Sequence, residues 1–233
     1  MPHVDSRASR SDAPRRLTLI ALALLTAACV PQVNSVAPEP SVPPFTAGVI
    51  PDSFVARLAT TKGDVDVIIR RDWAPNGAAQ FYEAVATGYY DGARFFRTIR
   101  GFVSQFGIAA DTALTARWRT RTIPDDAVTQ SNRRGTLVFA SGGPNTRTTQ
   151  MFINLRDNPR LDGLGFPPIG EVIRGLDAVD SLYTGYGDGA GAPSQDRITR
   201  EGEAYLAANF PLLDRIERAT VVRVWFPPTN PAP

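Results

Sequence analysis

The chain has 233 residues, of which 43% are hydrophobic and 21% are charged, values typical of a globular protein. Its formal net charge is +2, and the four arginines and two aspartates of residues 1–28 account for all of it. The rest of the chain is neutral and has no net field to attract nucleic acid, so we expect no nucleic-acid partner.

The rarest residues exclude several classes of enzyme. His3 is the only histidine and Cys29 the only cysteine, and both lie near the N-terminus. Nucleophilic catalysis by a Ser-His-Asp or Cys-His arrangement is therefore excluded from the rest of the chain, as are zinc sites built from histidine and cysteine. We expect no metal, no cofactor and no disulfide within the chain.

Residues 1–29 have the pattern of a secretory signal. Arg15 and Arg16 precede an apolar run over residues 17–28, which ends in small residues. The twelve residues of this run are too few to span a bilayer core of about 30 Å, so we expect no retained transmembrane helix.

The end of this run, Leu-Thr-Ala-Ala-Cys, resembles the lipobox of bacterial lipoproteins, in which the cysteine is lipidated and becomes the new N-terminus. The resemblance implies a lipoprotein-type signal peptide over residues 1–29 and a membrane anchor on Cys29, at the periplasmic side of a cell envelope. Val30 rather than an aspartate follows the cysteine, which favours the outer membrane. Ordinary signal cleavage near Ala28 is the alternative.

Three further regions follow the signal. Residues 30–52 contain six prolines and no hydrophobic periodicity, which predicts a semi-extended linker. Residues 53–226 have the patterns of a folded domain, and the proline-rich residues 227–233 predict a disordered tail.

The folded region begins with two β-rich runs, at residues 54–60 and 65–70, around a turn that predicts a hairpin. Pro75 then opens a helix that Gly88 ends. The rest reads as short elements: strands at 93–99, 102–106, 136–140, 150–155, 169–173 and 219–225, and helices at 176–183 and 199–210. Many short strands with few helices predict a mainly β barrel or sandwich capped by helices.

Three charged or glycine-rich motifs favour ordinary surface roles. The glycines of residues 185–191 lack a following Gly-Lys-Ser/Thr, so we expect a surface loop and no phosphate site. Asp125 and Asp126 follow a proline and read as a solvated turn rather than a cation site. Alternating arginines at residues 117–121 favour an exposed sheet face or a loop over a polyanion site.

Two segments are more specific. Residues 95–107 read Phe-Phe-Arg-Thr-Ile-Arg-Gly-Phe-Val-Ser-Gln-Phe-Gly, and residues 140–153 read Ala-Ser-Gly-Gly-Pro-Asn-Thr-Arg-Thr-Thr-Gln-Met-Phe-Ile. Together they resemble the cyclophilin family of peptidyl-prolyl cis-trans isomerases, and the resemblance extends over about residues 54–225. It implies a cyclophilin-like closed antiparallel β-barrel capped by helices, and X-Pro segments of unfolded or exposed polypeptides as substrates.

The resemblance also assigns the site. Arg97 matches the family's catalytic arginine, which donates to the prolyl nitrogen, and Gln105 matches the glutamine that orients it and contacts the peptide backbone. The matching substrate-binding residues are Phe102, Val103, Ser141, Gln150, Phe152 and Leu161. The family's pocket histidine is missing, and Phe166 near its place is expected to supply an apolar wall.

The resemblance leaves alternatives open. Arg160 stands where the family often has a tryptophan that aids drug binding, so sensitivity to cyclosporin-type ligands is in doubt. A non-catalytic, cyclophilin-like proline-peptide-binding or chaperone module is the main alternative to an isomerase acting in envelope-protein folding. A structural envelope lipoprotein that only recruits a partner is the second. We expect a monomer.

Overall fold

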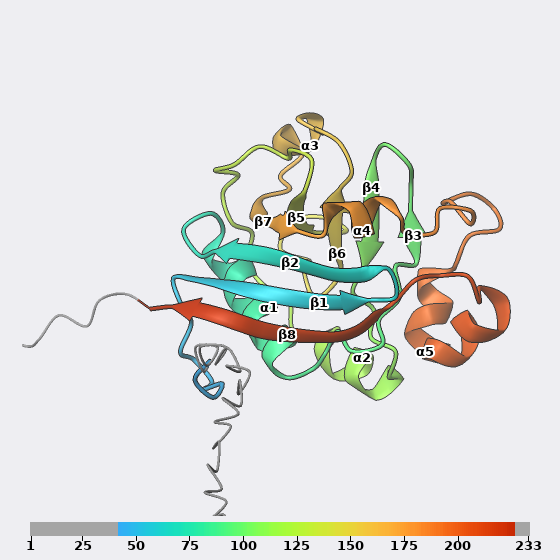
Figure 1. Cartoon of the computed structure of the whole chain (residues 1–233), viewed down its shortest axis with the longest axis horizontal. Helices are drawn as coiled ribbons and strands as arrows, with labels where there is room; N and C mark the ends of the chain where they lie inside the picture. The colour runs from blue at the N-terminus through green and yellow to red at the C-terminus, as the bar shows by residue number, and fades with distance from the viewer. Residues whose placement is uncertain (1–41, 227–233) are drawn as a thin grey trace, which may run out of the picture. The chain divides into compact units, whose positions relative to one another are not determined.

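The computed structural model describes residues 42–226, and one antiparallel sheet organises them (Figure 1). Its strands are β1 (Ser53–Thr60), β2 (Gly63–Arg70), β3 (Arg97–Thr98), β4 (Val103–Phe106), β5 (Thr136–Phe139), β6 (Met151–Asn154), β7 (Pro168–Arg174) and β8 (Ile216–Trp225). They pair in the order β3-β4-β6-β5-β7-β2-β1-β8. The predicted signal peptide with Cys29, the start of the predicted linker and the tail at 227–233 lie outside the described residues.

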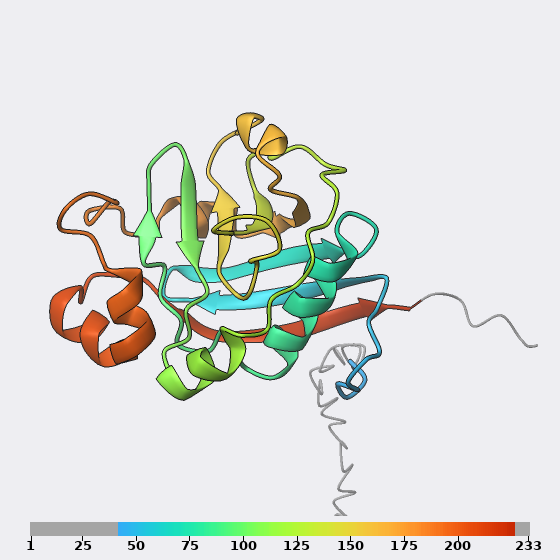
Figure 2. The same ribbon diagram turned by 180° about the vertical axis from the view of Figure 1, so that it is seen from behind.

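Five helices accompany the sheet in this part of the chain: α1 (Pro75–Ala86), α2 (Thr112–Trp118), α3 (Arg160–Gly163), α4 (Leu176–Asp180) and α5 (Gln195–Asn209). Helix α1 lies against the face formed by β1, β2 and β8 (Figure 2). The Phe54 ring of β1 stacks on Phe81 of α1, with ring centroids 6.3 Å apart, and Phe81 contacts Tyr90. These buried rings form the centre of the core. None of the helices in residues 42–226 is long and apolar enough to span a bilayer.

The sheet curls without closing. Strands β3 and β8 are its two edges, and the segments just before them meet through a single bridge between Arg94 and Arg215. β3 has only 2 residues, so it is too short to carry a ladder across to β8. The mainly β, antiparallel prediction is confirmed, but the predicted closed barrel is corrected to a curled half-barrel with a few helices.

The hairpin prediction is confirmed, because β1 and β2 pair from Thr60↔Gly63 outward. The predicted strand at 93–99 is wrong except for Arg97–Thr98, and the neighbouring backbone instead bonds to the segment before β8. For the arginines at 117–121 the sheet-face alternative is wrong and the loop alternative holds in part: the segment begins in α2, whose N-terminus is capped by the Asp111 carboxylate, and leaves the helix after Trp118.

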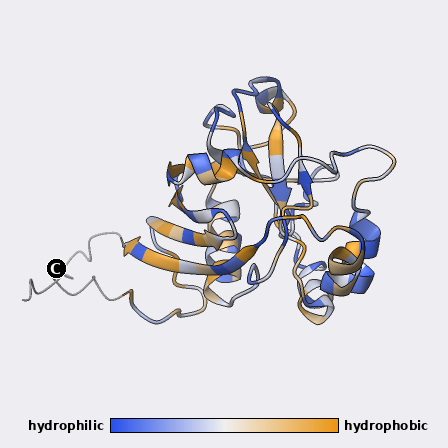
Figure 3. Ribbon diagram, turned by 45° about the vertical axis from the view of Figure 1, so that its right-hand side comes forward, coloured by the Kyte–Doolittle hydropathy of each residue, from blue (hydrophilic) through white to orange (hydrophobic). Residues whose placement is uncertain are grey.

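Helix α5 is longer than predicted and bends. Ser194 caps it by accepting a hydrogen bond from the Arg197 N–H, so the helix begins before residue 199. Gly202 adopts a φ of 59° inside it, which kinks the helix. Ile198, Tyr205 and Leu206 face a small core cluster, whereas much of the helix surface is hydrophilic (Figure 3).

Candidate functional site

Three long polar side chains form a row across the β3–β4–β6 end of the sheet. Arg97 of β3 is the register partner of Gln105 in β4, and its Nη1 donates to Gln105 Oε1 over 3.3 Å. Gln105 Nε2 donates in turn to Gln150 Oε1 over 2.9 Å. Gln105 is buried and Arg97 is partly exposed, so the row ends in a charged group that solvent or a ligand can reach.

The apolar residues predicted for the site lie together beside this row. Val103 and Phe152 are buried in a cluster with Val138, and Phe102, Leu161, Phe166 and Ala140 pack against it, partly exposed. The rings of Phe152 and Phe166 meet edge to face at 5.9 Å. The Arg97 guanidinium lies 5.9 Å from the Phe102 ring centroid, which joins the polar row to the apolar cluster. Val138 and Ala140 are members that sequence reasoning missed.

The remaining predicted residue, Ser141, lines a hollow of about 280 Å³ next to Gln105 and Gln150. Gln195, the first residue of α5, forms part of the opposite lining. The structure therefore brings all nine predicted site residues together in the polar row, the apolar cluster beside it and the lining of this hollow; these three features are called the groove around Arg97 below. Gln195 was missed because no local pattern links it to segments that lie far earlier in the chain.

A second hollow, of about 270 Å³, has Arg97 in its lining. Residues 187–189 of the glycine-rich segment and residues 192–195 form much of the rest, and Asp188 accepts a hydrogen bond from Arg97 Nη2 over 2.8 Å. The prediction of a surface loop is confirmed for this segment, which contains no helix or strand. Its contact with Arg97 was missed, because a lone aspartate among glycines carries no signal of its partner.

A buried asparagine network holds the apolar wall in place. The Asp162 carboxylate of α3 accepts hydrogen bonds from Ser131 Oγ, the Asn132 N–H and Asn132 Nδ2, and Asn132 Nδ2 also donates to the Phe166 carbonyl. Burial acts to raise the pKa of Asp162, but these hydrogen bonds outweigh it and lower that pKa below its usual value. Asn154 links Asn132 to Asn158, whose Nδ2 donates to the Phe102 carbonyl. The same network therefore holds both Phe166 and Phe102 of the apolar cluster.

The Asp125-Asp126 turn is only partly as predicted. Asp125 is exposed, but the Asp126 side chain is only 4% exposed: it accepts from the N–H groups of Asn76 and Gly77 at the start of α1 and pairs with the buried Arg147. The solvated-turn prediction is therefore wrong for Asp126, because its partner lies well along the chain. The described residues contain no group of three or more His, Cys, Asp or Glu placed to hold a metal.

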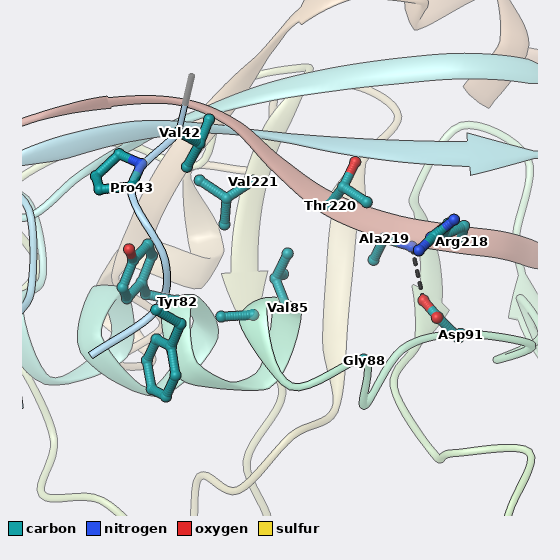
Figure 4. Close-up of a pocket in the computed structure, with 12 residues that line it drawn as sticks. Val42, Pro43, Tyr82, Val85, Gly88, Asp91, Arg218, Ala219, Thr220 and Val221 are labelled. Atoms are coloured by element: carbon teal, nitrogen blue, oxygen red, sulfur yellow. Dashed lines mark hydrogen bonds between the residues drawn. The ribbon is translucent and has the colours of Figure 1, made fainter. Parts of the chain in front are cut away.

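A separate shallow hollow lies between α1, β8 and residues 42–45 (Figure 4). It measures about 270 Å³, and Tyr82 and Val221 contribute to its lining. The Phe45 ring contacts Tyr82 at 5.8 Å, so this end of the predicted extended linker packs on the domain. No predicted site residue lines this hollow, and the groove around Arg97 is the better candidate site.

Comparisons with known proteins identify the family of most of the folded region. The family model for "Cyclophilin type peptidyl-prolyl cis-trans isomerase/CLD" matches residues 55–203, which include the whole groove. A peptidyl-prolyl cis-trans isomerase of Arabidopsis thaliana is 38% identical over 139 residues, covering 56% of this chain and 85% of that protein. One from Acinetobacter baylyi is 31% identical over 134 residues, covering 55% and 71%.

Solved structures show the same fold. A cyclophilin type peptidyl-prolyl cis-trans isomerase of Cryptosporidium parvum, crystallised in the presence of the dipeptide Ala-Pro, matches with a TM-score of 0.53 and 23% identity. The match covers 72% of this chain and 98% of that one. A cyclophilin of Hirschia baltica matches with a TM-score of 0.54 and 20% identity, covering 79% and 77%.

Proposed function

This chain belongs to the cyclophilin type peptidyl-prolyl cis-trans isomerase family, and on that premise we propose that the groove around Arg97 isomerises X-Pro bonds in exposed or unfolded polypeptide segments. The observation that carries the proposal is the junction of a reachable guanidinium with an apolar cluster. A proline needs both, because its ring is apolar and its nitrogen becomes a hydrogen-bond acceptor only when the peptide bond is twisted.

Arg97 is the proposed catalytic residue. Rotation about a peptide bond crosses a barrier of ~18–20 kcal/mol, because the resonance of the amide must be broken. In the twisted state the prolyl nitrogen regains a lone pair, and a permanently charged guanidinium can donate to it. Such a hydrogen bond is worth ~1.5–3 kcal/mol, which supplies about one to two orders of magnitude in rate. The remainder of the acceleration comes from binding and holding the twisted peptide.

Gln105 is proposed to position this donor. It is buried, and its amide is held on one side by Arg97 and on the other by Gln150. A side chain fixed in this way restricts the rotamers of Arg97 and points the guanidinium along the groove.

The apolar cluster is the proposed proline site. Phe102, Leu161 and Phe166 keep part of their surface exposed, whereas Val103 and Phe152 form the floor. The presence of Ala-Pro with the Cryptosporidium parvum protein supports proline-containing peptides as ligands of this fold. Ser141 and Gln150, which line the adjacent hollow, are proposed to contact the peptide on the side away from Asp188.

The test is a proline-isomerisation assay on the wild-type chain and Arg97→Ala. We expect the variant to lose one to two orders of magnitude in kcat/KM while its circular dichroism spectrum stays unchanged, since Arg97 is partly exposed. Full activity in a folded Arg97→Ala chain would refute the assigned role. Proline-peptide binding without acceleration by the wild type would favour a non-catalytic binding module, which the engagement of Arg97 by Asp188 makes the second candidate.

We also propose a location. The sequence pattern of residues 1–29 supports an exported chain with a lipid on Cys29, and residues 30–52 would tether a monomeric domain at the periplasmic side of the envelope. In this setting the substrates are envelope proteins during folding. Incorporation of labelled fatty acid into the wild-type chain, and its loss in Cys29→Ser, tests the anchor.

A further inference from the structure

The guanidinium proposed to act on the substrate already has an acidic partner. Arg97 Nη2 lies 2.8 Å from Asp188 Oδ2, and in residues 42–226 this is the only ion pair of either side chain. Arg97 is 28% exposed and Asp188 is 50% exposed, so the pair lies at the open end of the groove.

The segment that carries Asp188 is held at its ends and by Tyr186, whose ring packs on Phe210 with centroids 5.0 Å apart, whereas the backbone of residues 187–193 bonds only within the segment. At one end, the Tyr183 N–H donates to Asp214; at the other, the Ser194 N–H donates to the Tyr205 hydroxyl. Asp188 itself lies between Gly187, whose φ is +58°, and Gly189. Glycine imposes few limits on the backbone, so the carboxylate can leave Arg97 without disturbing the anchors.

Of the two side chains that bond Arg97, Asp188 is the one that can give way. Gln105 is only 8% exposed, and Gln150 holds its amide from the other side. Asp188 is half exposed, and water can replace its lost hydrogen bond. A substrate that needs donors of Arg97 therefore displaces Asp188 rather than Gln105.

Resting on the proposed function, we propose that Asp188 is a specificity-determining gate: its carboxylate occupies Arg97 until a peptide displaces it. Arg97 is the only cation that lines the hollow next to Asp188. A peptide with a lysine or arginine beside the proline replaces Arg97 as the partner of the released carboxylate. A peptide with an acidic residue there is repelled by it. The favoured substrates are thus X-Pro segments with a neighbouring basic residue.

The test compares the wild-type chain with Asp188→Asn on short peptides that differ in one residue beside the proline: lysine, alanine or glutamate. For the alanine peptide, we expect the variant to raise kcat/KM by about 1.5- to 5-fold, the range that an exposed ion pair provides. We also expect the ratio of kcat/KM between the lysine and glutamate peptides, above one in the wild type, to move toward one. An unchanged or lower value for the alanine peptide, or an unchanged ratio, overturns the gate.

Asp180→Asn is the matched control. Asp180 pairs with Arg134 at 2.6 Å, and its side chain is 47% exposed, close to the 50% of Asp188. It lines none of the hollows beside Arg97. Asp180→Asn changes the net charge by the same amount as Asp188→Asn. An equal effect of the two variants on the ratio of kcat/KM between the lysine and glutamate peptides would therefore also overturn the proposal.

Peptide affinity separates the gate from the isomerase activity. If the folded wild type accelerates no peptide, the proposed activity fails, and the dissociation constants of the same peptides decide the gate. Tighter binding of the alanine peptide by Asp188→Asn would then support it, and equal or weaker binding would refute it.

Discussion

Arg97 and Gln105 face each other across β3 and β4, and the Arg97 guanidinium donates to the Gln105 amide oxygen over 3.3 Å. The pairing is local, because the two residues are joined by a tight turn at residues 99–102. The orientation of the guanidinium therefore depends on the short β3–β4 ladder, which consists of the pairs Arg97↔Gln105 and Thr98↔Ser104.

Gln105→Ala should reduce kcat more than it raises KM. The variant keeps the donor and the apolar cluster but removes the hydrogen bond that orients Arg97. Loss of one hydrogen bond to a charged group, ~1.5–3 kcal/mol, corresponds to a decrease of about 10- to 150-fold in kcat. Steady-state kinetics of isomerisation measures it. Gln150→Ala removes a contact one step further from Arg97, so it should lower kcat by a smaller factor than Gln105→Ala. A larger decrease for Gln150→Ala than for Gln105→Ala would contradict the proposed row of contacts.

Phe166→Ala should weaken proline-peptide binding and leave kcat nearly unchanged. The Phe166 ring meets Phe152 edge to face at 5.9 Å and is only partly buried, so its loss removes one wall of the cluster. Aromatic pairs of this kind contribute ~0.5–1.5 kcal/mol, which corresponds to a rise of about 2- to 12-fold in the dissociation constant. Titration calorimetry with a proline peptide checks it. Leu212→Ala, an exposed apolar residue outside the groove, is the control.

Gly107→Ala should destabilise the domain by at least ~2 kcal/mol. Gly107 has a φ of +103°, and an added Cβ would lie 2.3 Å from the Thr149 carbonyl oxygen, too close for any atom to fit. The strain falls between the end of β4 and the start of β6, beside Gln105 and Gln150. Urea denaturation measures the change. Gly101→Ala has a positive φ in open space, so it should cost less; equal losses would show that the close contact is unimportant.

Acid should selectively remove the stability that Asp66 provides. Burial acts to raise the pKa of this carboxyl, but hydrogen bonds from Arg57 and Arg174 outweigh it and lower the pKa. Because the folded-state pKa lies below the unfolded value of about 3.9, the stabilisation is fully present above that pH and is lost as the pH falls through the folded-state pKa. The difference in unfolding free energy between wild type and Asp66→Asn should therefore be constant from pH 7 to 5 and shrink below pH 4. A difference that stays as large below pH 4 as it is at pH 7 would contradict this account.

The sequence predicted most where local pattern decides structure. The β1–β2 hairpin and α1 follow from alternation, turn residues and the position of Pro75. Seven of the nine groove residues lie in two motif segments, Leu161 and Phe166 followed from the wider family resemblance, and the structure brings all of them together. Their catalytic and binding roles remain predictions for the variants above.

The features that sequence reasoning missed depend on distant contacts. Asp126 looked solvated, because its partner Arg147 is brought to it only by the fold. Asp188 and Gln195 reach the groove through the segment between α4 and α5, whose path no local pattern indicates. The open edge of the sheet was missed for a similar reason: β3 begins only at Arg97, because the backbone just before it bonds to the segment before β8, and the turn at residues 99–102 follows at once.

The pairing of β1 with β8 has a mechanical consequence. Ser53, where β1 begins, is the register partner of Trp225, where β8 ends, so the chain enters and leaves the domain at the same end of one strand pair (Figure 1). A force applied between these two points opens the hydrogen bonds of β1 and β8 one after another, like a zipper, instead of shearing them together. The domain should therefore yield to a small pulling force at its ends, while a pull on one end alone leaves the groove at the opposite edge of the sheet unloaded.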